Sequence, residues 1–287
     1  MEDFAAEHFW VALPIALSLF FIAIYFAYRS SYFVLPAKSK AHPIAFKHLA
    51  GAFGTWFVIT LIFMPLLYIF AKKVPSSTPD MSNGIGAWLH LVYIAVAFVA
   101  LYSYLFALKK DVINNIFFEG QPHRIKALTK GLAIGAISWC VAYPTVLVVN
   151  LITGEIGKWI WGDNKIDQVA VKHLKGLASQ PLLYTLMVIC VIFLVPLIEE
   201  LLFRGFLQSW IRRYIGRIGG IIFTAIIFAL VHYSPAQGSV NFELICSLFV
   251  LSCFLGFIYE REKTLWAPIT LHAVFNGITV LFLSITE

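Results

Sequence analysis

Eight apolar stretches, each close to twenty residues long, divide this chain of 287 residues. They are predicted at 9–29, 50–71, 86–108, 130–153, 182–204, 218–235, 241–259 and 266–284. A helix of about twenty apolar residues crosses the hydrocarbon layer of a membrane and satisfies its own backbone hydrogen bonds there. The pattern therefore predicts an all-α, polytopic membrane protein with about eight transmembrane helices.

The composition agrees with a membrane-embedded chain. Hydrophobic residues make up 60% of it and charged residues 13%, against roughly 25% charged residues in a typical soluble domain. The net charge of +6 is expected to lie in loops that face the cytoplasm, so we predict no nucleic-acid partner. The four cysteines all lie in apolar stretches and are interpreted as small apolar residues.

Lysine and arginine are distributed unevenly between the two sets of loops. With the N-terminus outside, the inward loops carry 14 of the 21 basic residues, the outward loops carry 6, and Arg204 lies within a predicted span. A basic excess is typical of cytoplasmic loops. We therefore predict an integral membrane protein of the cell inner membrane with both termini outside.

The chain is predicted to form a single membrane domain over residues 1–287. Residues 1–153 supply the first helices and carry no motif, whereas residues 180–284 carry the polar groups described next. The outward connection 154–181 lies between them. Apolar residues recur there at helical spacing from Ile166 to Leu177, which predicts an amphipathic helix at the membrane interface.

Two adjacent glutamates, Glu199 and Glu200, lie far inside an apolar stretch that also contains Arg204. An ionised carboxylate in hydrocarbon is costly unless it is paired or faces a watery cavity. Glu200 and Arg204 are four residues apart in the favourable order for an ion pair, and Glu199 lies about 100° further round the helix. We therefore predict that Glu200 and Arg204 support the site and that Glu199 acts as a general base.

Two later spans contribute further polar groups. His232 lies within one of them, and His272 and Asn276 lie four residues apart on one face of the last helix. Two N–H donors that converge on one point can stabilise an oxyanion. Residue counts from the basic helix ends, at about 1.5 Å per residue, put these groups in the same layer as Glu199. We predict a polar active-site cavity within the helix bundle.

These three groups resemble the motifs of the CPBP group of intramembrane proteases. That group includes the type II CAAX prenyl endopeptidases and bacteriocin-processing and self-immunity proteins. The resemblance covers about residues 180–280. The motifs occur in the family's order, as Glu199-Glu200-x-x-x-Arg204, Phe228-x-x-x-His232 and His272-x-x-x-Asn276.

The resemblance implies an endopeptidase that hydrolyses a peptide bond within the membrane. Glu199 and His232 would activate a water, and His272 and Asn276 would stabilise the oxyanion. The substrate would be a peptide or a prenylated peptide, reached through membrane lipid.

Alternatives to this interpretation stay open. The same cluster suits a non-catalytic immunity or binding protein, or a proton-coupled transporter with Glu199 as the carrier. Glutamate and histidine are also zinc ligands, but the chain has no His-Glu-x-x-His helix. We therefore predict a route without cofactor or metal, with zinc as the less favoured alternative.

Overall fold

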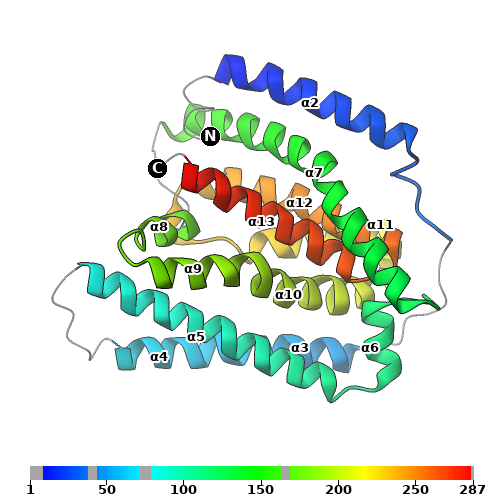
Figure 1. Cartoon of the computed structure of the whole chain (residues 1–287), viewed down its shortest axis with the longest axis horizontal. Helices are drawn as coiled ribbons and strands as arrows, with labels where there is room; N and C mark the ends of the chain where they lie inside the picture. The colour runs from blue at the N-terminus through cyan, green and yellow to red at the C-terminus, as the bar shows by residue number, and fades with distance from the viewer. Residues whose placement is uncertain (1–8, 38–43, 72–78, 163–168, 286–287) are drawn as a thin grey trace.

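The computed structural model describes residues 9–37, 44–71, 79–162 and 169–285, and its helices form a bundle (Figure 1). The α-helices are α2 (Phe9–Arg29), α3 (Phe46–Val58), α4 (Met64–Ala71), α5 (Pro79–Phe106), α6 (Lys110–Phe117), α7 (Arg124–Trp161), α8 (Val169–Lys175), α9 (Pro181–Ile189), α10 (Val195–Glu200), α11 (Ser209–Leu230), α12 (Val240–Glu262) and α13 (Trp266–Ile285). Three π-helical segments, Ile59–Phe63, Cys190–Leu194 and Leu201–Gln208, join successive helices. In these ranges the β structure is limited to one isolated bridge, between Phe118 and Thr264. The all-α prediction is confirmed.

Seven helical segments in the described ranges are long and apolar enough to cross a membrane, one fewer than the eight predicted. The difference lies in Pro181–Leu230, which runs for 50 residues. Gly216 interrupts it with φ 76° and ψ 175°. A Cβ placed on Gly220 would lie 2.9 Å from the Cβ of Arg212, whereas residues eight apart in a straight helix are about 12 Å apart. The chain therefore reverses at Gly216, and this one segment contains the predicted stretch 182–204 and the part of 218–235 that ends at Leu230.

The motif-bearing helices lie between the helices of the first half of the chain (Figure 1). On one side α7 packs against α12 and α13, and α2 packs on the outside of α7. On the other side α5 contacts α9 and α10, and α3 contacts the π-helical segment Leu201–Gln208. The start of α2 and the end of α13 lie at the same end of the bundle (Figure 1).

Helix α7 is longer than the predicted stretch 130–153, since it runs for 38 residues. Pro144 lies near its middle and removes one backbone donor, which accounts for the bend of α7 in Figure 1. Gly135 lies directly against the backbone of Ala267, where a side chain would collide. This close approach brings α13 against α7.

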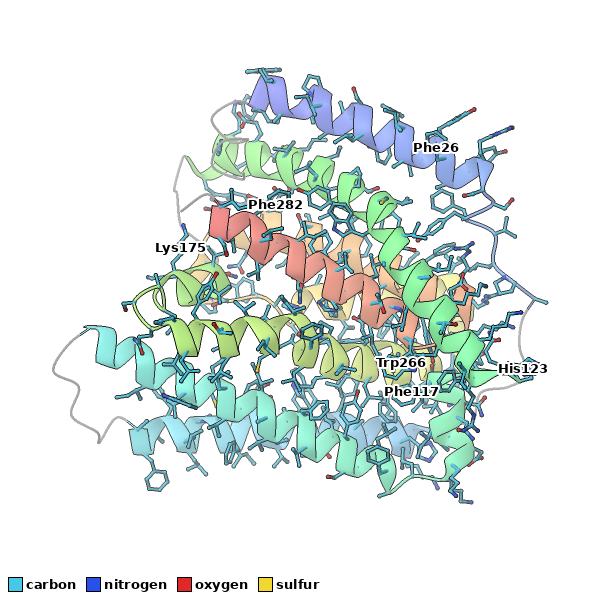
Figure 2. All side chains as sticks on the ribbon, viewed as in Figure 1. Phe26, Phe117, His123, Lys175, Trp266 and Phe282 are labelled. Carbon is cyan, nitrogen blue, oxygen red and sulfur yellow. The ribbon has the colours of Figure 1, made fainter. Side chains whose placement is uncertain are left out.

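The connection between α5 and α7 contains a helix that the sequence did not predict. Helix α6 buries Val112 and Ile116. Its end meets the start of α13, where the rings of Phe117 and Trp266 are 5.8 Å apart (Figure 2). The hydroxyl of Thr264 donates to the carbonyl of Phe117 at 2.8 Å.

The predicted interfacial helix is described only in part. Helix α8 covers Val169–Lys175, and Leu174 and Leu177 are buried. Ile166, at the start of the predicted helix, lies outside the described residues.

A group of charges near the reversal at Gly216, which we call the glutamate cluster, consists of the buried Glu119 and Glu260 and the partly buried Arg212 and Arg217. Glu260 accepts hydrogen bonds from Arg212 at 2.8 and 2.9 Å and from Arg217 at 3.0 Å. Arg212 also pairs with Glu119, and Arg217 donates to the carbonyl of Pro36. The cluster joins α11 and α12 to the segments that flank α3 and α7.

Candidate active site

Glu200 and Arg204 form a fully buried ion pair, as the sequence predicted. Nη1 of Arg204 donates to Oε1 of Glu200 at 3.2 Å, and Nε lies 3.2 Å from Oε2. The other end of the guanidinium donates to Ser252 on α12, to Oγ at 2.6 Å and to the carbonyl at 3.2 Å. Its Cζ lies 4.7 Å from the centroid of the Phe228 ring. Charge-assisted hydrogen bonds and a cation–π contact therefore replace water around the arginine.

The imidazole of His272 is held by the same carboxylate. Its Nδ1 donates to Oε1 of Glu200 at 2.8 Å. A carboxylate on Nδ1 fixes the tautomer and the ring orientation, which leaves Nε2 free for chemistry. That Nε2 lies 3.8 Å from Oε2 of Glu199. Glu200 therefore joins Arg204 on its own helix to His272 on α13.

His232 is oriented by the backbone of the helix that precedes it. Helix α11 ends at Leu230, and Nδ1 of His232, in the following turn, donates to the carbonyl of Phe228 at 2.7 Å. The opposite nitrogen, Nε2, lies 3.7 Å from Oε1 of Glu199. The ring of Phe228 packs 4.8 Å from the His232 ring. A single residue thus provides both a ring and a carbonyl that hold this histidine.

Glu199 lies between the Nε2 atoms of two histidines, His232 in the turn after α11 and His272 on α13. The separations of 3.7 and 3.8 Å exceed the usual length of a direct hydrogen bond. The side chain of Glu199 is 21% exposed and that of His232 is 30% exposed, whereas those of Glu200 and Arg204 are fully buried. The two glutamates therefore differ in access: Glu199 can meet a water or a substrate, and Glu200 cannot.

Asn276 has a partner that the sequence did not suggest. Its Nδ2 donates to the carbonyl of Val191 at 2.9 Å, in the π-helical segment Cys190–Leu194. The structure thus joins Asn276 to the helix that carries the glutamates, at a different position from His272. One N–H of the amide is used in this bond. The second N–H could still donate to an oxyanion, so the expected role of Asn276 stays a prediction.

The site contains residue types that zinc accepts, namely two imidazoles and a carboxylate. Across the ranges that the structure describes, however, no three His, Cys, Asp or Glu side chains are grouped so that they could hold a metal ion.

Three contributors were missed by the sequence reasoning. Ser252 anchors Arg204, Val191 anchors Asn276, and Phe228 contacts Arg204 and both histidines. Phe228 was visible as part of a motif but without a role. Nothing in the sequence distinguishes Ser252 or Val191, because their contacts depend on how the helices pack.

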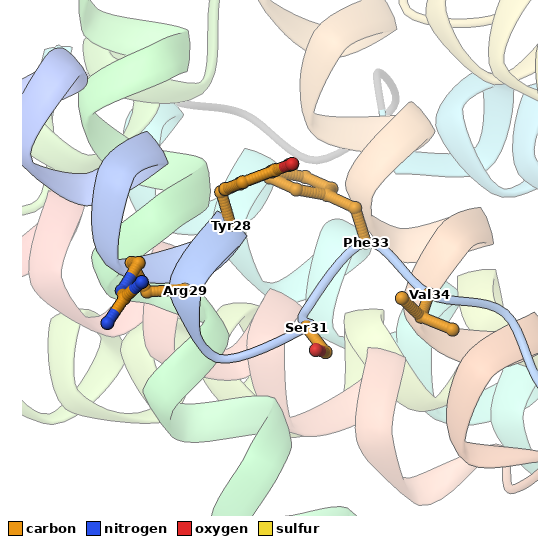
Figure 3. A pocket seen from close by; sticks show the side chains of 5 residues that line it. All are labelled: Tyr28, Arg29, Ser31, Phe33 and Val34. Carbon is orange, nitrogen blue, oxygen red and sulfur yellow. The ribbon is translucent and has the colours of Figure 1, made fainter.

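Two surface pockets are lined by residues other than those of this site. One, of about 310 Å³, is lined by small residues of α5. The other, of about 400 Å³, is formed where α2 passes into the following loop (Figure 3). Its lining residues are Tyr28, Arg29, Ser31, Phe33 and Val34. The predicted polar cavity around Glu199 stays a prediction.

Comparison with known proteins supports the same part of the chain. The family model for type II CAAX prenyl endopeptidase Rce1-like proteins matches residues 181–278. A protein of Bacillus subtilis (strain 168), named "Putative membrane peptidase YdiL", is 24% identical over 237 residues, which cover 79% of this chain and 87% of the relative. No solved structure matches the chain. The resemblance to the CPBP group, expected from the three motifs, is confirmed.

Proposed function

We propose that this chain, which is similar to type II CAAX prenyl endopeptidases over residues 181–278 and to the Bacillus subtilis relative over most of its length, is a membrane peptidase that cleaves its peptide substrate with Glu199 as the general base. The observation that carries the proposal is the position of Glu199 between two Nε2 atoms, at 3.7 and 3.8 Å. A water lying off the line between Glu199 and His232 could be roughly 2.8 Å from both. Among the glutamates of the site, Glu199 has the exposure that a general base needs.

The proposed reaction begins when Glu199 takes a proton from this water. The resulting hydroxide attacks the carbonyl carbon of the scissile bond and forms a tetrahedral oxyanion. The second N–H of Asn276 donates to the oxyanion, and so does Nε2 of His272 when its ring carries a second proton. The C–N bond then breaks. The proton held by Glu199 passes to the leaving amine, directly or through Nε2 of His232.

Glu200 and Arg204 support the site without touching the substrate in this proposal. Both are fully buried, and Glu200 holds His272 in the tautomer that presents Nε2. The support is rigid because Arg204 is bonded to two helices. Preorganised groups stabilise a developing charge without reorganisation during the reaction.

The proposed substrate is a peptide with a prenylated CAAX end, and the proposed location is a cell inner membrane with both chain termini outside. The prenyl group of the substrate would enter from the bilayer while the peptide comes from the cytoplasm. Residues 180–284 would form the catalytic core. The first helices, on both sides of that core, would separate it from lipid.

Cleavage of a fluorogenic prenylated CAAX peptide by the purified protein tests the proposal. Glu199→Gln keeps the volume of the side chain and removes the base, so activity should fall by at least 10²-fold, the lower range for loss of an acid–base group. The matched control is Glu155→Gln, because Glu155 is 43% exposed and pairs with Lys158 on the next turn of the same helix. That variant should keep full activity.

The outcomes separate the parts of the proposal. Cleavage that persists in Glu199→Gln would overturn the role of the base. Loss of cleavage on addition of a chelator would establish metal dependence and overturn the metal-free route. Equal cleavage of the same peptide without its lipid would overturn the prenylated substrate while leaving the hydrolase in place.

A further inference from the structure

The carbonyl of Val191 is available to Asn276 because of a gap in the helical hydrogen bonds. The N–H of Val195 donates to Cys190, five residues back. The next residue, Pro196, has no N–H and therefore cannot donate to Val191 in the same pattern. The free carbonyl accepts instead from Nδ2 of Asn276 at 2.9 Å.

This bond decides which way the Asn276 amide faces. A carbonyl only accepts, so it selects the NH₂ group over the oxygen of the amide. Nδ2 carries two N–H groups, and the one that does not bind Val191 points in a fixed direction. A donor that is oriented before the reaction begins is what an oxyanion site needs.

Pro196, which causes the gap in the hydrogen bonds, lies on the same helix as Glu199, the proposed base. Pro196 precedes Glu199 by three residues, or nearly one helical turn. Helix α13 is bonded to this stretch at two points, His272 to Glu200 and Asn276 to Val191. These contacts run in opposite order along the two helices, as expected for antiparallel neighbours. They fix α13 in register with the glutamates.

We propose that Pro196 is a positioning residue of the peptidase: its missing N–H keeps the Val191 carbonyl free to orient the Asn276 amide toward the oxyanion. The effect on catalysis rests on the proposed function, whereas the competition for the Val191 carbonyl does not. Pro196 itself touches neither the substrate nor the reacting atoms. It acts through Val191 and Asn276.

A double-mutant cycle tests this role. Pro196→Ala introduces an N–H that competes for Val191, so kcat should fall about tenfold with KM changed less than twofold. Loss of one oxyanion donor costs about 10²–10³-fold in kcat, so Asn276→Ala should lower kcat by about that factor. The double variant should be no slower than Asn276→Ala. Additive losses, or an unchanged kcat in Pro196→Ala, would overturn the proposal.

Thermal stability in detergent gives a second measurement that needs no substrate. Asn276→Ala leaves the buried carbonyl without a donor and should lower Tm, and Pro196→Ala should restore part of that loss by supplying one. Absence of this recovery would overturn the hydrogen-bond exchange. Asn276→Asp, which keeps the volume and loses both N–H groups, replaces Asn276→Ala if the latter does not fold.

The control is Pro144→Ala in α7, a second proline inside a helix, which should keep kcat within twofold of the wild-type value. Inactivity of the wild-type protein would mark failure of the proposed function. The Tm cycle would still report separately whether Pro196 and Asn276 compete for Val191.

Discussion

Arg204 is fully buried, and the groups that stabilise its charge belong to three helical segments. Glu200 supplies the countercharge, Ser252 accepts from the outer nitrogen, and the face of Phe228 lies 4.7 Å away. Removal of one partner from such an ion pair costs more stability than the intact pair contributes, because the other partner remains buried and charged. The same reasoning explains why His272 depends indirectly on Arg204: both bind the carboxylate of Glu200.

The replacement Arg204→Ala should therefore lower the free energy of unfolding by about 3–5 kcal/mol, the usual range for breaking a buried ion pair. The measurement is thermal or denaturant unfolding of the purified protein in detergent. The control is Arg213→Ala nearby, whose exposed side chain donates to the carbonyl of Trp210 and lies over the ring of Tyr214. It should change stability by less than about 0.5 kcal/mol. Equal effects of the two variants would contradict a structural role for Arg204.

At this scale the sequence predicted contacts within a helix better than contacts between helices. The pairing of Glu200 with Arg204 follows from a spacing of four residues, and it is present. The bond from His272 to Glu200 joins residues 72 positions apart. It depends on where α13 lies against α10, which periodicity does not specify. The Asn276 contact with Val191 was missed for the same reason.

Gly216 is the element-scale feature that turns one long helical segment into two antiparallel ones. Its backbone has φ 76° and ψ 175°, a conformation that is essentially restricted to glycine. The reversal brings Gln208 and Ile221 to the same residue, Gly256, on α12. Without it, the segment Pro181–Leu230 could not bring Glu199 close to His232, which lies in the turn after Leu230.

Gly216→Ala should destabilise the protein by about 1–3 kcal/mol, because an L side chain is strained in this conformation. Unfolding in detergent measures the change. Gly54→Ala is the matched control, since Gly54 is helical and its missing side chain would meet open space. Alanine there should be neutral or stabilising by up to about 1 kcal/mol. A destabilisation at Gly54 as large as that at Gly216 would refute the explanation by backbone conformation.

The apolar stretches predicted the elements well and their ends poorly. The break between the stretches 182–204 and 218–235 was predicted, because glycines and arginines interrupt the hydrophobicity there. Helix α7 exceeds its predicted stretch at both ends, since hydropathy marks the membrane-embedded part of a helix and not its polar extensions. Helix α6 was missed because only two of its eight residues are buried.

At the scale of the whole molecule, the helices without motifs enclose those with motifs. Helices α2 and α7 lie on one side and α3 to α5 on the other (Figure 1). The start of α2 and the end of α13 lie at one end of the bundle, as an even number of crossings requires. The orientation in the membrane rests on the basic residues of the loops, and stays a prediction.

Cysteine labelling in cells measures this orientation. In a background without the four native cysteines, Ile285→Cys should react with a membrane-impermeant maleimide added from outside. Arg213→Cys, near the reversal at Gly216, should react only after the membrane is permeabilised. Both positions are exposed. The reverse pattern would overturn the prediction that the termini are outside, and labelling of both without permeabilisation would contradict the span count.

The glutamate cluster has a consequence for the order of events during synthesis. Arg212 precedes Glu260 by 48 residues and Arg217 precedes it by 43. At about 5–20 residues per second, Arg212 is added to the chain roughly 2–10 s before Glu260. During this interval Glu119 is the one carboxylate of the cluster that has been made, and Arg217 must remain hydrated at the membrane surface. Insertion of α12 is therefore the event that allows the two halves of the Gly216 hairpin to be joined through Glu260.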